Sequence, residues 1–349
     1  MSFQTNNNDV TLILPESVGV KHIPLLVSAL SQVRTSLGNV ELDCSKVQFF
    51  DPLGITVLAA AIKEALAQGR RVAMPWLAAN ITSYLERMNF FVNMDVAAVD
   101  VPQNRTRNDQ RGNLLEITHI VDASTSEAVA DQLAAAIVTM VIGRGQKPLD
   151  FKVPDTEYEQ YYRPLRYALS ELIENALTHA RREGAFNSSV WVAAQYYKDI
   201  QTGGRVQVAV VDTGCGFLAT LQNHPELQEK THGAAIRIAL KPKISCNRDI
   251  GPFGESVNEG VGLTTTVKIS KATGGDVHII SGDALFLVGG VAAGKRSDQV
   301  RPLPSKWDGV AISATFICQK LPLINIADLL TQVMVTKQVK TPVVLRFDD

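Results

Sequence analysis

The sequence predicts an α/β protein with two domains, and three observations support this prediction. The chain of 349 residues is long for a single domain. Its hydrophobic share of 46% and charged share of 20% are typical of chains that bury sizeable cores. Apolar strand patterns and amphipathic helix patterns alternate along much of its length. Such alternation favours helices packed on sheets.

The first domain is expected over residues 1–100. Strand patterns alternate there with helix patterns, which predicts a small α/β layer. The strand patterns are VTLILPE, NVELDCSKVQFF and RRVAMPW, and the helix patterns are KHIPLLVSALSQVRTSLG, GITVLAAAIKEALAQG and NITSYLERMNF. Residues 101–113, VPQNRTRNDQRGN, are polar, charged and aperiodic, so we expect a linker.

The second domain is expected over residues 114–322, with a C-terminal extension at residues 323–349. A strand at LLEITHIV precedes two helical regions, of which the second contains Pro164. Strand patterns dominate the remainder, apart from one helix at GLTTTVKISKATG. The predicted architecture is an α/β sandwich with helices on one face of a mixed sheet.

Charge and composition narrow the classes of function. The 34 basic and 35 acidic residues nearly cancel, so no nucleic-acid partner is evident. No apolar stretch reaches the roughly twenty residues of a spanning helix, and the polar start lacks a signal-peptide pattern. We therefore expect a cytoplasmic protein without a membrane segment. The four scattered cysteines form no CxxC pair, which favours free thiols over zinc or disulfides.

A glycine-rich stretch at residues 289–298, GGVAAGKRSD, has the spacing of a phosphate-binding loop. That motif requires GxxxxGK followed by a hydroxyl residue, and it must open a helix. Here Arg296 occupies the hydroxyl position, and Pro302 and Pro304 follow where the helix would begin. We interpret residues 291–308 as the turn of a hairpin, with Lys295 at its tip and away from any nucleotide.

A polar stripe is expected on the helix SELIENALTHA. Glu171, Asn175 and His179 recur every fourth residue and therefore share one helix face. A carboxylate there can activate a water or hydroxyl, and an amide can bind Mg²⁺. A solvated helix face would give the same pattern. For His179 a packing or surface role is favoured over catalysis.

Two glycine motifs follow. In VQVAVVDTGCGF a strand runs into Asp212, and Gly214 and Gly216 let the backbone turn away. The carboxylate can accept a hydrogen bond from an exocyclic amine such as that of adenine, or it can simply cap a tight turn. In NEGVGLTTT, Gly260 and Gly262 precede a helix whose free amide groups form an anion site.

The order of these motifs resembles the Bergerat-fold (GHKL) ATP-binding domain, which gyrase-type topoisomerases, Hsp90 chaperones, histidine kinases and anti-sigma-factor serine kinases share. The resemblance covers residues 114–322 and implies ATP and Mg²⁺ as cofactors. It implies that Glu171 is the general base, that Asn175 binds Mg²⁺ and that Asp212 recognises adenine. The residues implied to shape the pocket or meet the phosphates are Gly214, Gly216, Gly260, Gly262 and Leu263.

The same resemblance implies an ATP lid at residues 217–259. A phosphate contact and a solvated loop explain its basic residues equally well; these are Lys230, Arg237, Lys241, Lys243 and Arg248. The last core strand of the family often carries a Gly-Thr pair that turns a hydroxyl toward adenine. This chain has Val310 after Gly309, so that contact is missing unless Thr315 supplies it.

Residues 1–100 resemble a STAS domain, the fold of anti-sigma-factor antagonists. The resemblance lies in VELDCSKVQFFDPLGITVLAAAIKEALAQGRRVAM, where a strand ends at Asp51 and a helix follows Gly54. Phosphorylated members of that family carry DSSG at this turn, whereas this chain has Asp51-Pro52-Leu53-Gly54. Neither serine position holds a hydroxyl, which leaves a docking domain that works without phosphorylation.

The two resemblances together imply a signalling or regulatory protein that binds Mg-ATP. It would be an ATPase or a serine/threonine kinase-like switch that couples nucleotide state to partner binding through the STAS-like domain. The alternative is a nucleotide-gated binding module without turnover. The implied partner is a regulatory protein of the STAS or sigma/anti-sigma type. The sequence decides neither whether the protein forms a homodimer nor whether the phosphoryl acceptor is water or a protein.

Overall fold

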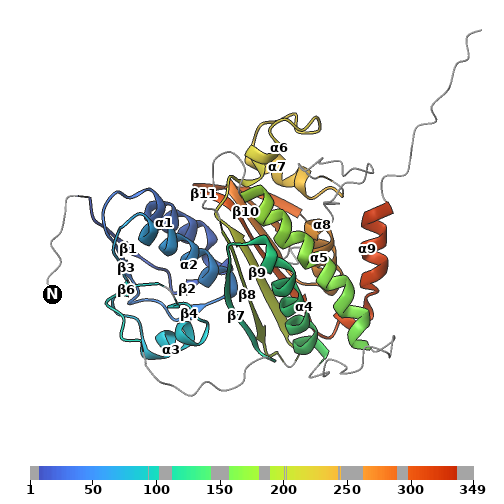
Figure 1. Ribbon diagram of the computed structural model, residues 1–349, viewed down its shortest axis with the longest axis horizontal. Coiled ribbons are helices and arrows are strands. Elements are labelled where there is room, and N and C mark those ends of the chain that lie inside the picture. The colour runs from blue at the N-terminus through green and yellow to red at the C-terminus, as the bar shows by residue number, and fades with distance from the viewer. Residues whose placement is uncertain are drawn as a thin grey trace, which may run out of the picture.

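The computed structural model describes residues 8–92, 94–101, 112–142, 157–180, 189–199, 201, 203–242, 244, 262–288 and 298–335. Over these residues the chain forms a four-stranded sheet in the order β1-β3-β5-β6 and a five-stranded sheet in the order β10-β11-β9-β8-β7. Helices pack on both sheets (Figure 1). The α/β class predicted from the sequence is confirmed.

The N-terminal unit is an alternation of strands and helices. Its elements are β1 (Val10–Ile13), β2 (Ser17–Val18), α1 (Ile23–Thr35), β3 (Val40–Asp43), β4 (Phe49–Phe50), α2 (Pro52–Ala67), β5 (Val72–Ala73), α3 (Ala79–Arg87) and β6 (Val96–Ala97). The strand pairs are parallel, and Val10, Val40, Val72 and Val96 lie side by side. Parallel neighbours need crossover connections, which the helices provide.

Helix α2 begins at a capped turn and is buried almost all round. The Asp51 carboxylate accepts a hydrogen bond from the backbone N–H of Gly54 at 2.9 Å, and Pro52 occupies the first helical turn. The small side chains Ala59, Ala60 and Ala61 are at most 1% exposed. A helix that is apolar on every side must be covered on every side.

The five strands of the larger sheet all belong to the second part of the chain. Its elements and their flanking helices are β7 (Leu114–Ile120), α4 (Ser126–Ile142), α5 (Glu157–Ala180), β8 (Val190–Tyr197), β9 (Arg205–Asp212), α6 (Gly216–Leu221), α7 (His232–Ala239), α8 (Gly262–Thr273), β10 (Val277–Val288), β11 (Asp298–Ile317) and α9 (Ile326–Val335). All four strand pairs of this sheet are antiparallel, where we expected a mixed sheet. The hairpins β8–β9 and β10–β11 account for two of these pairs.

The hairpin β10–β11 is longer than expected, because residues 298–308 belong to the strand rather than to the turn. Pro302 lies opposite Ala284 of β10, in the part of β11 that has no register with β9. Proline is tolerated there because only one neighbouring strand needs hydrogen bonds. Lys295 and the glycines around it lie outside the described residues, so their assignment to the hairpin tip stays a prediction.

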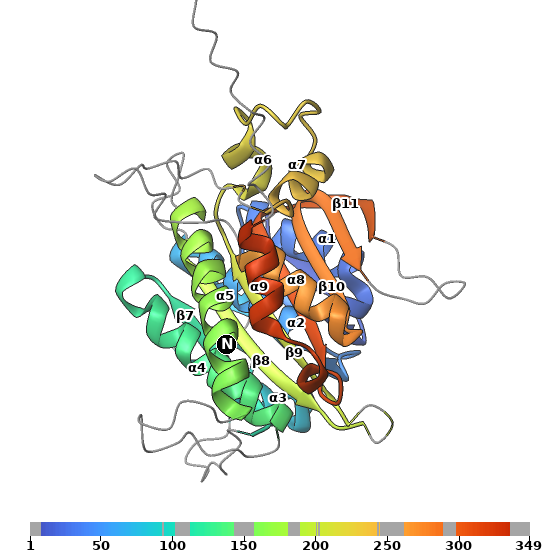
Figure 2. The ribbon, with the colours of Figure 1, turned by 90° about the vertical axis from the view of Figure 1, so that its right-hand side faces the viewer.

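Both faces of the larger sheet are covered. Side chains alternate along β9, so that Val206, Val208 and Val210 face α5 while Ala209 and Val211 face the other way. Helices α4, α5 and α8 cover the first face, and α9 packs against α5 and α8 (Figure 2). The C-terminal extension therefore begins as part of this layer.

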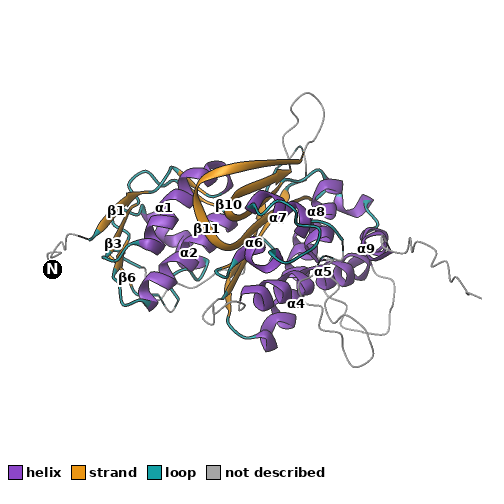
Figure 3. Ribbon diagram, turned by 90° about the horizontal axis from the view of Figure 1, so that it is seen from above, coloured by secondary structure: helices purple, strands orange, loops and turns teal. Residues whose placement is uncertain are grey.

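The second face of this sheet is covered by α1 and α2, where we expected helices on one face only. Helix α1 packs on β11, and α2 packs on β8 and β9. Figure 3 shows α1 and α2 between the two sheets. One buried cluster joins Leu58 of α2 to Trp191, Val211 and Trp307. The two predicted domains thus share a core, although the boundary at residues 101–113 lies mostly outside the described residues.

In the part of the chain that the structure describes, no helix combines the length and the apolar character needed to cross a membrane.

Candidate functional site

An apolar pocket opens where β9 ends. Residues of α5, α6, α7, α8 and β11 form its walls. Four residues predicted from the motifs line it together, namely Asn175, Asp212, Gly216 and Leu263. These come from three stretches that are far apart in the sequence, so the fold brings the predicted motifs to one place.

Asp212 is the last residue of β9, and its side chain is only 5% exposed. One carboxylate oxygen accepts a hydrogen bond from the backbone N–H of Gly214 at 2.9 Å. Burial raises the pKa of Asp212 to about 7, although hydrogen bonds from the backbone of Gly214 and Val310 oppose this increase. A ligand that donates a further hydrogen bond would stabilise the ionised carboxylate.

Gly309 packs behind Asp212 and has a φ of 106°, a conformation that glycine favours. A Cβ atom at this position would lie 2.3 Å from the carbonyl oxygen of Asp212. The next residue, Val310, lines the pocket at the position where the resemblance implies a hydroxyl residue. Thr315 lies further along β11, opposite Gln207, and is not among the lining residues. The described lining therefore offers no hydroxyl from Thr315.

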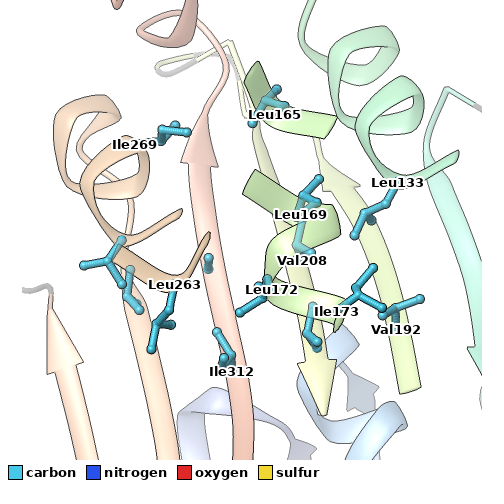
Figure 4. Packing of buried hydrophobic residues seen from close by; sticks show 14 of the residues in the cluster. Leu133, Leu165, Leu169, Leu172, Ile173, Val192, Val208, Leu263, Ile269 and Ile312 are labelled. Carbon is cyan, nitrogen blue, oxygen red and sulfur yellow. The ribbon is translucent and has the colours of Figure 1, made fainter. Parts of the chain in front are cut away.

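Helices α5 and α8 meet at Gly262. A Cβ atom there would lie 2.7 Å from the backbone nitrogen of Leu172 and 2.8 Å from the Cβ atom of Glu171, so only glycine allows this approach. The contact brings Leu263 beside Leu172 and close to Ile312, as Figure 4 shows. These apolar side chains form one wall of the pocket.

Glu171 and Asn175 occupy successive turns of α5. Asn175 is half-buried and lines the pocket. Glu171 is 7% exposed and lies at the crossing of α5 and α8, outside the lining residues. The amide thus faces the ligand space directly, whereas the carboxylate lies one helical turn away.

Four of the predicted residues are described only in part or not at all. Gly260 lies outside the described residues, as do Lys243 and Arg248 of the expected lid. For His179 only the backbone position is described, in the last turn of α5. Their roles stay predictions.

The first part of the expected lid is a packed wall rather than an open loop. Helix α7 is capped by Thr231, whose hydroxyl accepts a hydrogen bond from the backbone of Ala234 at 3.1 Å. Ile236 and Ala239 are buried, and Ala239 lines the pocket. The sequence signal was present, because THGAAIRIALK combines a capping threonine with helical apolar spacing.

The basic residues of that segment have different surroundings. Lys241 forms an ion pair with Glu226 at 2.9 Å, and Lys230 donates to the backbone carbonyl of Gln222. Arg237 is exposed.

The described residues include no group of three or more histidine, cysteine, aspartate or glutamate side chains that could hold a metal ion. The cysteines they contain, Cys44, Cys215 and Cys318, are free thiols, and Cys246 lies outside the described part.

Comparison with known proteins relates part of the chain to a family. Residues 161–301 match the family described as Histidine kinase-, DNA gyrase B-, and HSP90-like ATPase. The match begins inside α5 and ends inside β11, so it includes Glu171, Asn175, Asp212 and Leu263, whereas the lining residues Val310 and Ile312 lie beyond its end. It supports a GHKL ATP-binding fold here, and that family implies ATP binding with ATPase or kinase-type activity. A search of curated proteins found no match.

Proposed function

We propose that this protein binds Mg-ATP in the pocket at the end of β9 and works as an ATP-dependent regulatory switch. The observation that carries the proposal is the buried Asp212 carboxylate beside an apolar cavity. Adenine is a flat apolar ring with an amine at its edge. Leu172, Leu263 and Ile312 can cover the ring, while Asp212 accepts a hydrogen bond from the amine.

The available side chains fit a magnesium ion that arrives with the nucleotide. Mg²⁺ usually keeps several waters and binds through few protein oxygens plus substrate phosphates. The amide oxygen of Asn175 is one such ligand at the edge of the pocket. When bound, Mg²⁺ would neutralise charge on the phosphate oxygens. The N-terminal amide groups of α8, which begins at Gly262, face the same negative charge.

Glu171 is the proposed general base. It lies one turn before Asn175 on the same helix and beside the start of α8, where the phosphates would sit. A carboxylate there can take the proton of a water or of a protein hydroxyl as the phosphoryl group is transferred. The same residue therefore fits an ATPase and a serine/threonine kinase.

A nucleotide-gated binding module is the second candidate, and one observation favours it. Glu171 is buried at the crossing of two helices and does not line the pocket. Bound nucleotide would then act only by shifting a conformational equilibrium.

Phosphate release from purified protein separates the two candidates. We expect Glu171→Ala to lower the rate by about 10²-fold or more, as loss of a general base does, while ATP still binds in a calorimetric titration. Glu174→Ala on the same helix is the matched control and should keep the wild-type rate. Equal rates in the wild type and Glu171→Ala, with ATP bound by both, would leave only the binding module.

We further propose that the N-terminal unit couples the nucleotide to a regulatory protein of the STAS or sigma/anti-sigma type. The turn at Asp51-Pro52-Leu53-Gly54 is buried in the described structure. A partner that used Pro52, Leu53 or Gly54 would first have to uncover these residues. Other surfaces of the unit are therefore the better candidates for docking.

A further inference from the structure

One arginine of the N-terminal unit contacts β11 behind the proposed adenine site. Arg34 of α1 makes two hydrogen bonds to the carboxylate of Glu64 on α2, with its Nε atom 2.5 Å from Oε2 and its Nη2 atom 3.2 Å from Oε1. Its Nη1 atom also donates to the backbone carbonyl of Asp308 on β11 at 2.9 Å. The guanidinium group is thus fixed between two helices and the strand behind the pocket.

Trp307 connects this arginine to Asp212. The indole ring is fully buried, and the Arg34 guanidinium lies 4.9 Å from its centroid. The indole N–H donates to the backbone carbonyl of Asp212 at 3.3 Å. Two residues further along β11, Gly309 packs against the same carbonyl. The backbone of Asp212 is therefore held from behind by a strand segment that Arg34 holds in turn.

Glu64 contacts the residue that follows Asp212. Its carboxylate accepts a hydrogen bond from the side chain of Thr213. The positive charge of Arg34 also lowers the pKa of Asp212, against the stronger effect of burial. The pair thus acts on both the position and the charge of the carboxylate.

We propose that Arg34 and Glu64 are positioning residues of the nucleotide site, through which docking of the N-terminal unit and adenine recognition by Asp212 depend on each other. The inference rests on the proposed ATP site, but its two residues lie outside the matched family segment at 161–301. Coupling between two sites is reciprocal. ATP binding would therefore strengthen the docking of α1 and α2 by the factor by which docking strengthens ATP binding.

The test compares two nucleotides that differ at the edge of the base. ATP carries an amine where inosine triphosphate carries a carbonyl, so at this position of the base an ionised Asp212 accepts a hydrogen bond only from ATP. Without Arg34 the carboxylate is less constrained and more easily protonated, and a protonated carboxyl donates to the carbonyl instead. We expect Arg34→Gln to lower the ratio of ATP affinity to inosine triphosphate affinity by about tenfold at pH 7.

The matched control is Arg87→Gln. Arg87 of α3 forms an ion pair with Glu116 of β7, which also joins the N-terminal unit to the sheet but lies two strands away from β9. We expect this variant to keep the affinity ratio of the wild type. If both variants lowered the two affinities equally, the ion pairs would serve stability alone and the proposal would be overturned.

The remaining outcomes are also decisive. Binding of ATP by the wild type together with an unchanged ratio in folded Arg34→Gln would overturn this inference and leave the proposed function standing. Failure of the wild type to bind ATP would contradict both. If Arg34→Gln did not fold, as judged by thermal unfolding, Trp307→Phe would replace it. That variant keeps an apolar ring and removes the hydrogen bond to Asp212, and a wild-type ratio in it would overturn the proposal.

Discussion

Two buried aspartates lie at turns where a strand gives way to a helix, and they have different surroundings. Asp51 accepts hydrogen bonds from the backbone of Gly54 at 2.9 Å and of Val20 at 2.8 Å, and Gln207 also bonds to it. Asp212 accepts a hydrogen bond from Gly214, is held by backbone contacts, and borders a cavity. The Asp51 carboxylate organises its own backbone, whereas the Asp212 carboxylate can also serve a ligand.

The contacts that each carboxylate already makes within the chain explain the difference between the two aspartates. Gly19 packs so closely on Asp51 that a Cβ atom at Gly19 would lie 2.1 Å from the carboxylate. Both aspartates border a cavity, and the cavity beside Asp51 is also lined by Arg205 and Gln207. Each oxygen of Asp51 already accepts a hydrogen bond from the backbone. A sequence motif of aspartate followed by glycine therefore does not separate a helix cap from a binding site, because the hydrogen bonds that the carboxylate already accepts decide.

The largest expected effect is that of Asp212→Asn on nucleotide binding. The amide would present the wrong hydrogen-bonding group to adenine or lose its contact with Gly214. We expect ATP affinity to fall by about 10²-fold, the cost of an unmatched buried polar pair, while the fold stays intact. Calorimetry with ATP measures the change. An unchanged affinity would mean that the adenine site lies elsewhere.

The opposite pattern is expected for Asp51→Ala. The variant removes a helix cap and leaves the buried N–H groups of Val20 and Gly54 without their acceptor. We expect a loss of about 2–3 kcal/mol in the free energy of unfolding, measured by urea denaturation. ATP affinity of the folded protein should change less than twofold. A variant as stable as the wild type would show that Asp51 is not structural.

The smallest expected effect is a pH dependence of base recognition. Since the pKa of Asp212 is raised to about 7, the ionised form that accepts the adenine amine is lost as pH falls below that value. We expect adenosine affinity to fall by about tenfold between pH 8 and pH 6 and to level off above pH 8. Adenosine avoids the titration of phosphate groups. Asp212→Asn should abolish the dependence, and a similar slope in that variant would assign it to another group.

The raised pKa of Asp212 also determines how protein stability changes with pH. Asp212 holds a proton in the folded state at pH values where the unfolded chain has released it. Its contribution to stability is therefore present below the unfolded pKa of 3.8 and is lost as pH rises to about 7.

The sequence predicted the parts of the site that are local in the chain. Asp212, Gly216, Asn175 and Leu263 were selected by motif and line one pocket, because each stands in a short pattern whose geometry follows from one helix or one strand end. Helix α7 was missed, although its capping threonine and apolar spacing were visible.

Contacts between distant segments could not be predicted. Arg34 and Asp308 are 274 positions apart, and no local pattern links them. The covering of the second sheet face did leave a signal, because VWVAA and VQVAVV are apolar at nearly every position rather than at alternate ones. Strands of that kind are typical of sheets buried on both faces. The prediction of helices on one face only was therefore wrong although this signal was visible.

The all-round burial of α2 limits how modular this chain can be. Its small alanines fit between two sheets, so each sheet provides part of the surface that the helix needs. A fragment that began after the N-terminal unit would present Trp191, Trp307 and the alternate residues of β9 to water. Such a contiguous apolar face favours aggregation. The two units are therefore expected to be inherited, expressed and purified together rather than exchanged separately.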